Sequence, residues 1–377
     1  MEFGLFIQGY NPGFRREGNP DAEHQAFMDE LAAVQAADKA GFKYVWITEH
    51  HFLDEYSHLS ANDVIAGYLA HSTERIHIGS GIFNPLAQVN HPVKVAERVA
   101  MLDHLSNGRF EFGTGRGAGS HEILGFLYRD RITDTNATKE MWEETIGEFP
   151  KMWLQDEYEG FEGKYWSLPP RRILPKPYKK PHPAMWYAAG NTTSWEMAGR
   201  KGLGVLGFSV GALDQVPPLR NAYKKAIANA EPVGAFVNDN LMVCIAAYVA
   251  EDTQKARSSM VNARPNYLVS NVFRYHDTFP HPPEVPNWPT LIPDVKLEEI
   301  DFYTSTGGVC GNPDEALEQV KRWEDTGIDQ LVFGIGPAPL ADTVEMIELM
   351  GKHVIPKIDP DPVHSTTKYR EAAAKKG

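Results

Sequence analysis

Three ionisable residues, Glu49, His50 and His51, follow directly after the apolar run Tyr44–Ile47. Such a run is typical of a buried strand, and the carboxyl ends of strands carry the chemistry of α/β folds. Histidine titrates near neutral pH, so it can donate or accept a proton there. Consecutive strand side chains point to opposite faces, so we expect one histidine to reach a substrate and the other to face a neighbouring loop. A histidine pair can also be a plain surface feature, but its position favours catalysis.

A glycine-rich segment from Gly113 to Gly119 surrounds Arg116 and follows another strand-like run. Glycines let backbone amides approach an anion, and a guanidinium offers a forked donor to phosphate. Glycine-rich turns also occur after barrel strands for conformational reasons alone. Arg116 and Gly117 are therefore phosphate-binding candidates that need a second signal.

The segment from Ala188 to Ser194 supplies that signal, because it follows a strand-like run and opens a helix pattern. A helix start presents unpaired backbone amides, a favourable dipole and here hydroxyl donors. The same residue types are ordinary N-caps. Two such segments at successive strand ends favour one shared phosphate. The candidates in this second segment are Ala189, Gly190, Asn191, Thr192 and Thr193.

Small residues at Gly79, Ser80 and Gly81 precede Ile82 at a further strand end, where a flat ligand could lie against the backbone. A bend that needs glycine explains them equally well. The other histidines show no metal-ligand spacing with carboxylate partners, so we expect no metal site. We interpret them as surface or core residues: His24, His58, His71, His77 and His91.

Strand and helix patterns alternate along the chain, which indicates parallel βαβ units. Eight strands and their helices predict an α/β fold, a (β/α)8 TIM barrel with insertions, as one domain over residues 1–360. The expected strands are Phe3–Gln8, Tyr44–Thr48, Arg75–Ile82, Arg109–Gly113, Pro183–Ala188, Leu203–Phe208, Leu241–Val249 and Gln330–Gly334. The expected helices are one from Asn19-Pro20 to Gly41, one from Pro92 to Ser106, and Met141–Trp153, Thr193–Lys201, Leu213–Ala230 and Pro313–Thr326.

Two regions depart from this alternation. Prolines crowd the stretch 264–306 and predict that it contains no regular helix, so we expect an insertion that acts as a mobile lid or binding loop. Residues 361–377 form a polar C-terminal tail that we expect to be frayed.

Composition limits the partners and the compartment. The 377 residues carry a net charge of −13 and no dense Lys/Arg block, which argues against nucleic acid or a membrane surface and favours small molecules. Two cysteines, Cys244 and Cys310, suggest neither a disulfide framework nor a zinc motif. No apolar run reaches membrane-spanning length and Met1 leads straight into a strand-like run, so we expect a soluble cytoplasmic protein.

Taken together, these motifs resemble the bacterial luciferase-like family of flavin-dependent monooxygenases, most of all the luciferase α subunit. The resemblance implies a β/α barrel that binds reduced FMN, supplied by a separate NAD(P)H:flavin reductase, and reacts it with O2. It also implies a homodimer. The resembling segments are Met1–Tyr10, Trp46–Phe52, His91–Val93, Leu102–Phe110, Phe112–Gly117 and Thr192–Trp195.

The resemblance gives several residues a role. His50 matches the catalytic histidine, which exchanges a proton as the flavin hydroperoxide forms or breaks down, and His51 matches its partner beside Glu49. Arg116 matches the arginine on the FMN phosphate, with Gly190 and Thr193 at the other phosphate positions. Gly81 and Ile82 match a pair joined by a cis peptide beneath the isoalloxazine ring.

Two departures from the luciferase α subunit concern the phosphate site. Gly115 stands where that subunit has a cysteine, and Asn136 stands where it has a second phosphate arginine. The affinity for phosphate is therefore expected to be lower or differently distributed.

Three functions follow from the resemblance. The first is a two-component FMN-dependent monooxygenase acting on an apolar aldehyde, ketone or hydrocarbon. The second is a non-catalytic partner subunit, but such subunits tend to lose the second histidine and the phosphate arginine, and this chain keeps both. The third is an F420-dependent oxidoreductase on the same barrel.

Overall fold

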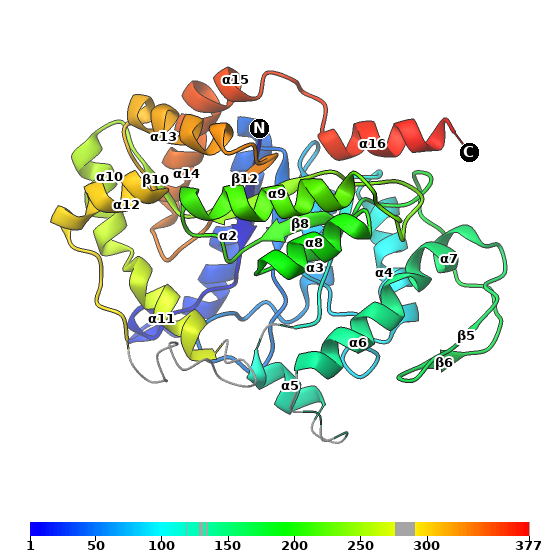
Figure 1. Ribbon diagram of the computed structural model, residues 1–377. Coiled ribbons are helices and arrows are strands. Elements are labelled where there is room, and N and C mark those ends of the chain that lie inside the picture. The colour runs from blue at the N-terminus through cyan, green and yellow to red at the C-terminus, as the bar shows by residue number, and fades with distance from the viewer. Residues whose placement is uncertain (118, 128–129, 131, 133–134, 276–290, 377) are drawn as a thin grey trace.

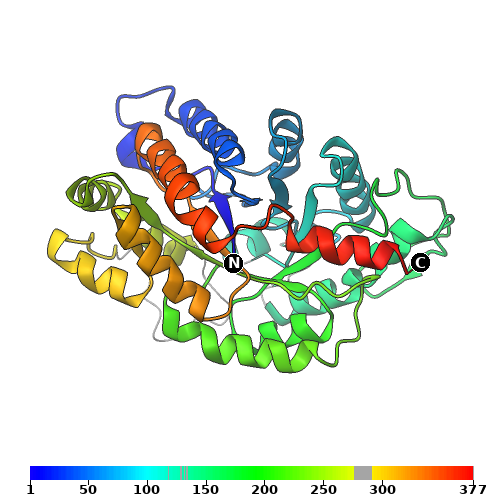
Figure 2. The same ribbon diagram turned by 90° about the horizontal axis from the view of Figure 1, so that it is seen from above.

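Eight parallel strands form a closed barrel in the computed structural model, which describes residues 1–376 apart from 118, 128–129, 131, 133–134 and 276–290 (Figure 1). Their order around the barrel is β1-β12-β9-β8-β7-β4-β3-β2. The predicted TIM barrel is confirmed, and Figure 2 shows helices surrounding the strands. The barrel strands are β1 (Glu2–Ile7), β2 (Tyr44–Ile47), β3 (His77–Ser80), β4 (Phe110–Thr114), β7 (Met185–Ala188), β8 (Gly204–Gly207), β9 (Leu241–Ile245) and β12 (Gln330–Gly334).

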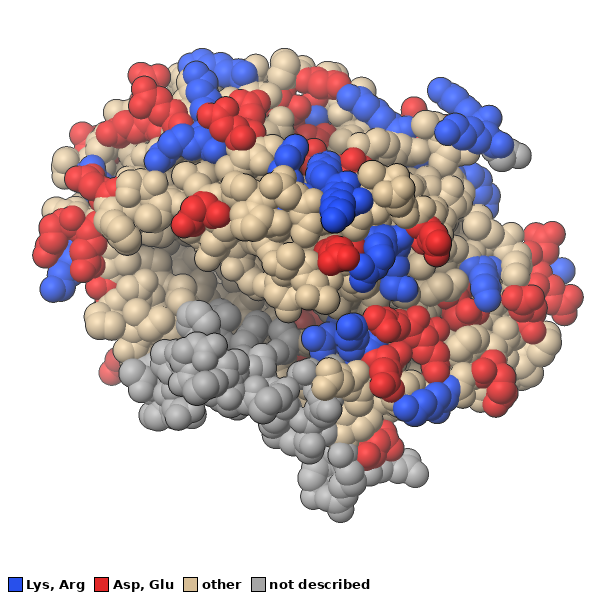
Figure 3. All heavy atoms as spheres, viewed as in Figure 1, with Lys and Arg blue, Asp and Glu red and all other residues tan. Residues whose placement is uncertain are grey.

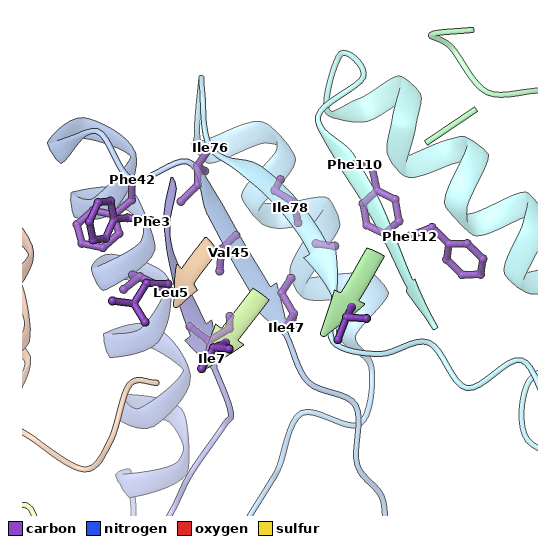
Figure 4. Close-up of a cluster of buried hydrophobic side chains, with 14 of the residues drawn as sticks. Phe3, Leu5, Ile7, Phe42, Val45, Ile47, Ile76, Ile78, Phe110 and Phe112 are labelled. Atoms are coloured by element: carbon purple, nitrogen blue, oxygen red, sulfur yellow. The ribbon is translucent and has the colours of Figure 1, made fainter. Parts of the chain in front are cut away.

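The barrel strands are buried on both faces, which explains why their sequences read as nearly continuous apolar runs. Side chains alternate between the two faces. One set, which includes Phe3, Leu5 and Ile7 of β1, packs against the surrounding helices (Figure 4). The other set fills the barrel interior and includes Phe6, Trp46, Trp186, Leu206 and Met242.

Glycine makes room for the two interior tryptophans. A Cβ atom on Gly79 would lie 2.3 Å from the Trp46 ring, and one on Gly204 would lie 2.4 Å from the Trp186 ring. Neither position could hold any larger residue without displacing an indole. The Trp46 ring therefore packs over Gly79 of the neighbouring strand β3, and the Trp186 ring packs over Gly204 of the neighbouring strand β8.

Helices follow the strands largely where they were predicted. The first long helix begins at Ala22 rather than at Asn19-Pro20, because the Asn19 side chain accepts the Asp21 N–H at 3.1 Å and holds a turn ahead of it. It ends, as predicted, at Gly41, whose φ is +94°. The helices around the barrel include α1 (Gly13–Arg16), α2 (Ala22–Ala40), α3 (Asn62–Ser72), α4 (Pro92–Leu105), α5 (Ser120–Phe126), α8 (Thr192–Arg200), α13 (Pro313–Asp325) and α14 (Leu340–Leu349).

Three predicted elements are each divided in two. The helix expected at Met141–Trp153 is interrupted at Gly147, because Pro150 cannot bond to the Ile146 carbonyl and its ring would clash with it. Leu213–Ala230 begins as a 3-10 turn before becoming helical. Leu241–Val249 leaves the barrel after Ile245. The resulting elements are α6 (Thr135–Ile146), α7 (Glu148–Leu154), η2 (Leu213–Gln215), α9 (Val216–Ile227), and β10 (Ala247–Val249), which pairs with β11 (Val309–Gly311).

The prediction of no regular helix in 264–306 is wrong at both ends. Helices α11 (Pro265–Tyr275) and α12 (Ile300–Thr306) lie there, since Pro265 occupies a first helical turn and 300–306 contains no proline. Most of the prolines lie in 276–290, outside the described residues. Helix α11 is held by Glu55, which accepts the Tyr267 hydroxyl at 3.0 Å and the Asn271 amide at 3.1 Å.

The expectation of a frayed C-terminal tail is also wrong. Residues Ser365–Ala374 form α16, which lies at the end of the barrel where the strands begin (Figures 1 and 2). The Ser365 N–H donates to Glu2 at 2.9 Å, and the Thr366 hydroxyl donates to Glu111 at 2.6 Å. Hydrogen bonds, rather than apolar contacts, hold this helix, which is why its polar sequence looked unstructured.

The remaining features concern the cysteines, the length of the helices and the surface charge. Both cysteines are free. In the part of the chain that the structure describes, no helix has the length and apolar character needed to cross a membrane. Lysine and arginine are interspersed with aspartate and glutamate on the face seen in Figure 3. The other elements are β5 (Phe161–Glu162), β6 (Ser167–Leu168), α10 (Thr253–Asn262), η3 (Leu297–Glu299), η4 (Met350–Val354) and α15 (Ile355–Ile358).

Candidate active site at the carboxyl end of the barrel

His50 lies just beyond the carboxyl end of β2 and is buried, with 8% of its surface exposed. Its backbone N–H donates to the Leu59 carbonyl at 3.1 Å, which fixes the start of the loop. Its Nδ1 lies 3.0 Å from Oε1 of Glu122 on α5. The histidine predicted to be catalytic is therefore one half of a buried imidazole–carboxylate pair.

Glu122 sits between two imidazoles. His121 Nε2 lies 3.8 Å from the same Oε1 atom that His50 contacts. Burial opposes ionisation of Glu122, but the imidazoles of His121 and His50 outweigh it and hold the pKa of this carboxyl well below its usual range. Neither Glu122 nor His121 is among the residues predicted for the site, although a His-Glu pair soon after Arg116 was a signal for both.

One donor atom from each of His50, His121 and Glu122 lies within 4.8 Å of the others, a spacing that could hold a cation. The hydrogen bond between His50 and Glu122 already accounts for their close approach. That no metal is needed here stays a prediction.

Glu49 and His51 form a separate pair. His51 Nε2 lies 3.5 Å from Glu49 Oε1, which also accepts the Asn90 amide at 3.0 Å. The Glu49 carboxylate raises the pKa of His51, whereas burial raises the pKa of Glu49 itself. The His51 ring makes an edge contact with Phe126 of α5, with ring centroids 4.9 Å apart. Both histidines thus contact α5, but through different partners.

The Gly81–Ile82 peptide bond is cis, as the resemblance implied. Asn62 of α3 donates its side-chain amide to the Ile82 carbonyl at 3.2 Å, so a neighbouring helix holds the backbone directly after the cis bond. Partly buried apolar side chains, including that of Ile82, pack against the cluster that fills the barrel interior. These residues form an apolar floor at the mouth of the barrel: Ile82, Ala188, Phe208 and Cys244.

Arg116 is oriented by two neighbouring elements. Its Nη1 donates to the Thr138 hydroxyl of α6 at 3.1 Å. Its guanidinium also lowers the pKa of the Tyr187 hydroxyl on β7, although burial raises that pKa overall. Asn136 lies two residues before Thr138, exposed in the first turn of α6. The amino end of α6 and Arg116 therefore lie at the same part of the barrel mouth.

The amino end of α8 forms the other candidate phosphate segment. The Asn191 side chain accepts the Ser194 N–H at 3.0 Å, and the Ser194 hydroxyl accepts the Asn191 N–H at 3.0 Å. The capping interpretation is thus correct for the side chain of Asn191. Thr192 and Thr193 are exposed, and their backbone N–H groups have no acceptor among the described residues.

Strand register brings the two segments together. Thr114 of β4 pairs with Tyr187 of β7. Arg116 and Ala189 each come two residues after this pair, so they lie at the same height above the barrel. A Cβ atom on Gly190 would meet the Ser209 hydroxyl at 3.2 Å, so a side chain there would crowd this edge. Arg116, Gly190 and the start of α8 can therefore contact one anion.

The segment after β4 also joins the phosphate candidates to His50. Gly117 has a φ of +77°, and a Cβ atom there would lie 3.0 Å from Glu122 Oε2. Glycine is needed at this turn for both reasons. The short stretch from Arg116 to Glu122 thus presents a guanidinium at one end and the partner of His50 at the other.

These residues fit a flavin mononucleotide. The guanidinium and unpaired helix amides match a phosphate, and the glycine at position 81 with the apolar floor matches a flat ring. The residues that would hold FMN are Gly81, Ile82, Arg116, Gly117, Ala189, Gly190, Thr192 and Thr193, with Asn136 and the backbone of Asn191 at the edge.

The chain belongs to the luciferase-like monooxygenase family, whose sequence model matches residues 1–330. It is 28% identical over 349 residues to the oxygenase component of the flavin-dependent trigonelline monooxygenase of Acinetobacter baylyi, covering 89% of each chain. It is 24% identical to an F420-dependent glucose-6-phosphate dehydrogenase of Amycolatopsis mediterranei, covering 89% of this chain and 96% of that one.

The fold is shared with the oxygenating constituent of 3,6-diketocamphane monooxygenase from Pseudomonas putida, which was solved in complex with FMN. The two structures superpose with a TM-score of 0.75 at 21% identity, covering 95% of this chain and 98% of that one. The family therefore contains enzymes that use FMN and enzymes that use F420.

Proposed function

We propose that this protein is the oxygenase of a two-component system, which uses reduced FMN and O2 to insert one oxygen atom into a small apolar molecule. The observation that carries this proposal is the segment from Arg116 to Glu122. In this segment, Arg116 can donate hydrogen bonds to a phosphate, and Glu122 is the partner of the buried His50. One short segment thereby supplies both a candidate phosphate anchor and the partner of the candidate proton-exchanging histidine.

Each part of the site has a task in this reaction. Arg116 and the amides at the start of α8 bind the phosphate, and Gly81 and Ile82 support the ring. Reduced FMN, when bound, supplies the two electrons that activate O2, so that one oxygen atom enters the substrate and the other leaves as water. His50 exchanges a proton with the reacting groups, and the loop after β2 holds it in place.

The apolar floor supports an aldehyde, ketone or hydrocarbon as the substrate class. Phe208, Ile82 and Cys244 present carbon and sulfur surface at the mouth of the barrel. An apolar molecule loses little by leaving water for such a surface, whereas a charged one would need a partner there.

The test combines the purified protein with a NAD(P)H:flavin reductase, FMN and a panel of aldehydes, ketones and alkanes. We expect O2 uptake that depends on both proteins and yields a product heavier by one oxygen atom, with 18O incorporated from 18O2. His50→Gln should abolish the product while leaving FMN binding intact. Flavin oxidation that only ever yields hydrogen peroxide, across the whole panel, would contradict the proposal.

F420-dependent hydride transfer is the second candidate, because the match to the F420-dependent dehydrogenase covers most of both chains. Equilibrium binding separates the two cofactors. We expect reduced FMN to bind more tightly than reduced F420, since the chain is 28% identical to the flavin-dependent oxygenase component and 24% identical to the F420-dependent dehydrogenase. Tighter binding of F420, with alcohol oxidation in the absence of O2, would replace the first proposal by the second.

We infer further that the protein forms a homodimer through α3 and α4, which pack side by side. Large apolar side chains one helical turn apart are exposed on both helices. On α3, Val64 is 68% exposed and Tyr68 is 47% exposed, whereas on α4 Met101 is 48% exposed and Leu105 is 54% exposed. Such a surface on neighbouring helices is typical of an interface.

A further inference from the structure

We propose that Glu122 is the positioning residue of His50, which sets the imidazole tautomer and supplies the counter-ion of its protonated form. The proposal rests on the function proposed above and adds a residue to it. An ionised carboxylate can only accept hydrogen bonds. Across the 3.0 Å contact, His50 Nδ1 must therefore carry the hydrogen, which leaves Nε2 as the atom that accepts and returns a proton.

The burial of the pair makes the contact strong. Side-chain exposure is 10% for His50 and 6% for Glu122, so water screens their interaction little. The two residues lie 72 positions apart, on the loop after β2 and on α5. Glu122 therefore also fixes how α5 lies over the loop that carries His50.

Three other titratable residues that the structure describes lie near the pair of His50 and Glu122. His121 faces the same carboxylate from α5, at 3.8 Å, which is longer than a hydrogen bond. Tyr56 faces His50 from its own loop, with ring centroids 5.3 Å apart, and burial keeps the pKa of the tyrosine hydroxyl far above neutral pH. Glu49 flanks the pair but is bonded to His51 and Asn90. Glu122 is the carboxylate within hydrogen-bond distance of His50 among the described residues.

The chain offers a matched control in the pair of His58 and Glu23. His58 Nδ1 lies 2.6 Å from Glu23 Oε1, the same kind of contact, but the Glu23 side chain is 61% exposed. Glu23→Gln removes a carboxylate from a histidine without touching the barrel mouth. This variant therefore shows how the loss of a histidine–carboxylate hydrogen bond affects the protein when the bond lies outside the proposed site.

The first test measures tautomers directly, in protein without flavin. Long-range 1H–15N NMR spectra of 15N-histidine protein, with His50 assigned from His50→Gln, identify which ring nitrogen carries hydrogen at alkaline pH. We expect hydrogen on Nδ1 in the wild type and a shift toward Nε2 in Glu122→Ala, with Glu122→Asp in between. Glu23→Gln should change the signals of His58 alone. Hydrogen on Nε2 in the wild type, or no change in Glu122→Ala, would overturn the proposal.

The second test measures the steady-state kinetics of Glu122 variants and their dependence on pH. Glu122→Gln keeps the shape and an acceptor oxygen but removes the charge. We expect kcat to fall about 10²-fold with little change in KM for reduced FMN, and the midpoint of the pH–rate profile to move to lower pH. Glu122→Asp should recover part of the rate. A fall in kcat with no movement of the pH profile, or a loss confined to KM, would show that Glu122 is merely structural.

A third measurement separates this arrangement from a metal site on the same residues. Dialysis against EDTA should leave the His50 tautomer and the activity unchanged, and added Zn2+ should not raise the activity. Loss of both on EDTA treatment, with recovery on adding Zn2+, would overturn the hydrogen-bond proposal. If no substrate is ever oxygenated, the proposed function fails, but the tautomer spectra still decide the role of Glu122.

Discussion

Asn62 of α3 donates one side-chain amide to two carbonyl oxygens, at 3.2 Å to Ile82 and at 3.4 Å to Ile47. Ile47 ends β2 and precedes the loop with His50, whereas Ile82 belongs to the cis peptide at the end of β3. The proposed support of the flavin ring and the loop of the proposed proton-exchanging histidine therefore share one buried hydrogen-bond donor.

Asn62→Leu should damage both segments at once. The substitution removes the side-chain donor of the Ile82 carbonyl, whereas the Ile47 carbonyl keeps the Gly81 N–H at 2.7 Å, and we expect a cost of about 1–3 kcal/mol in unfolding free energy. We also expect weaker FMN binding and a lower kcat. Denaturant unfolding and flavin titration measure these effects, with Asp63→Asn on the outer side of the same helix as the control. Normal FMN affinity in a destabilised Asn62→Leu protein would contradict the prediction that Asn62 supports the flavin site.

Arg116→Met should weaken the binding of FMN but not that of riboflavin, which lacks the phosphate. A charge-assisted hydrogen bond contributes roughly 1.5–3 kcal/mol, so the dissociation constant should rise about 10- to 100-fold. Quenching of flavin fluorescence measures both ligands, and the exposed Arg172→Met is the control. An equal loss for FMN and riboflavin would mean that Arg116 supports the loop and does not bind phosphate.

Arg370→Ala should strongly destabilise the protein although it lies far from the proposed active site. Its guanidinium donates twice to Asp103, both at 2.8 Å, and the Asp103 side chain is fully buried. Removing one partner of a buried pair costs about 3–5 kcal/mol. Lys368→Ala on the same helix removes an exposed ion pair and should leave the unfolding midpoint unchanged. Equal midpoints for the two variants would show that α16 does not hold the barrel.

His182 should give the native protein an acid-sensitive step. Its Nδ1 donates to the Pro183 carbonyl at 2.8 Å and its Nε2 accepts the Ala235 N–H at 2.8 Å, so the ring is neutral. Burial lowers its pKa from 6.5 to about 4. Between these values the unfolded chain binds a proton that the native protein does not, so stability falls as pH falls from about 6.5 to about 4.

The loss from His182 should amount to roughly 3 kcal/mol at pH 4. Chemical denaturation across this range measures it. His182→Gln should be less stable at pH 7 but lose less on acidification, whereas the exposed His24→Gln should keep the wild-type slope. A wild-type slope in His182→Gln would assign the acid step to other groups.

Val64→Glu combined with Leu105→Glu should turn a dimer into a monomer, because two carboxylates would have to be buried in the interface. Light scattering after size exclusion measures the mass. The control is Phe302→Glu, which changes an apolar side chain that is 74% exposed on α12. A wild-type protein that is monomeric at all concentrations, or a dimer that both substitutions leave intact, would contradict this interface.

The barrel was predictable because its strands are local signals. Runs such as Tyr44–Ile47 and Gln330–Gly334 are apolar, short and bounded by polar or glycine residues, and this pattern needs no knowledge of distant contacts. The positions of His50 and Arg116 followed from the strands that precede them. The cis peptide at Gly81–Ile82 followed only from the family resemblance.

The parts that were missed depend on contacts between distant residues. Glu122 contacts His50 across 72 positions, so its local sequence could mark it as a candidate but could not identify His50 as its partner. Helix α16 lacks an apolar face of the usual kind and is held by Glu2, Glu111 and Asp103, which come from the first third of the chain. The break before α7 is an exception, because it follows from the local sequence: Pro150 cannot donate a backbone hydrogen bond to the fourth preceding residue.

The place of α16 in the chain has a consequence for biosynthesis. Glu2 is translated 363 residues before its partner Ser365, and Glu111 is translated 255 residues before its partner Thr366. Domains begin to fold during synthesis from the amino end. Until α16 has been translated, these two carboxyl groups therefore stay uncovered at the end of the barrel where the strands begin, and chaperones that bind nascent chains have that interval in which to act.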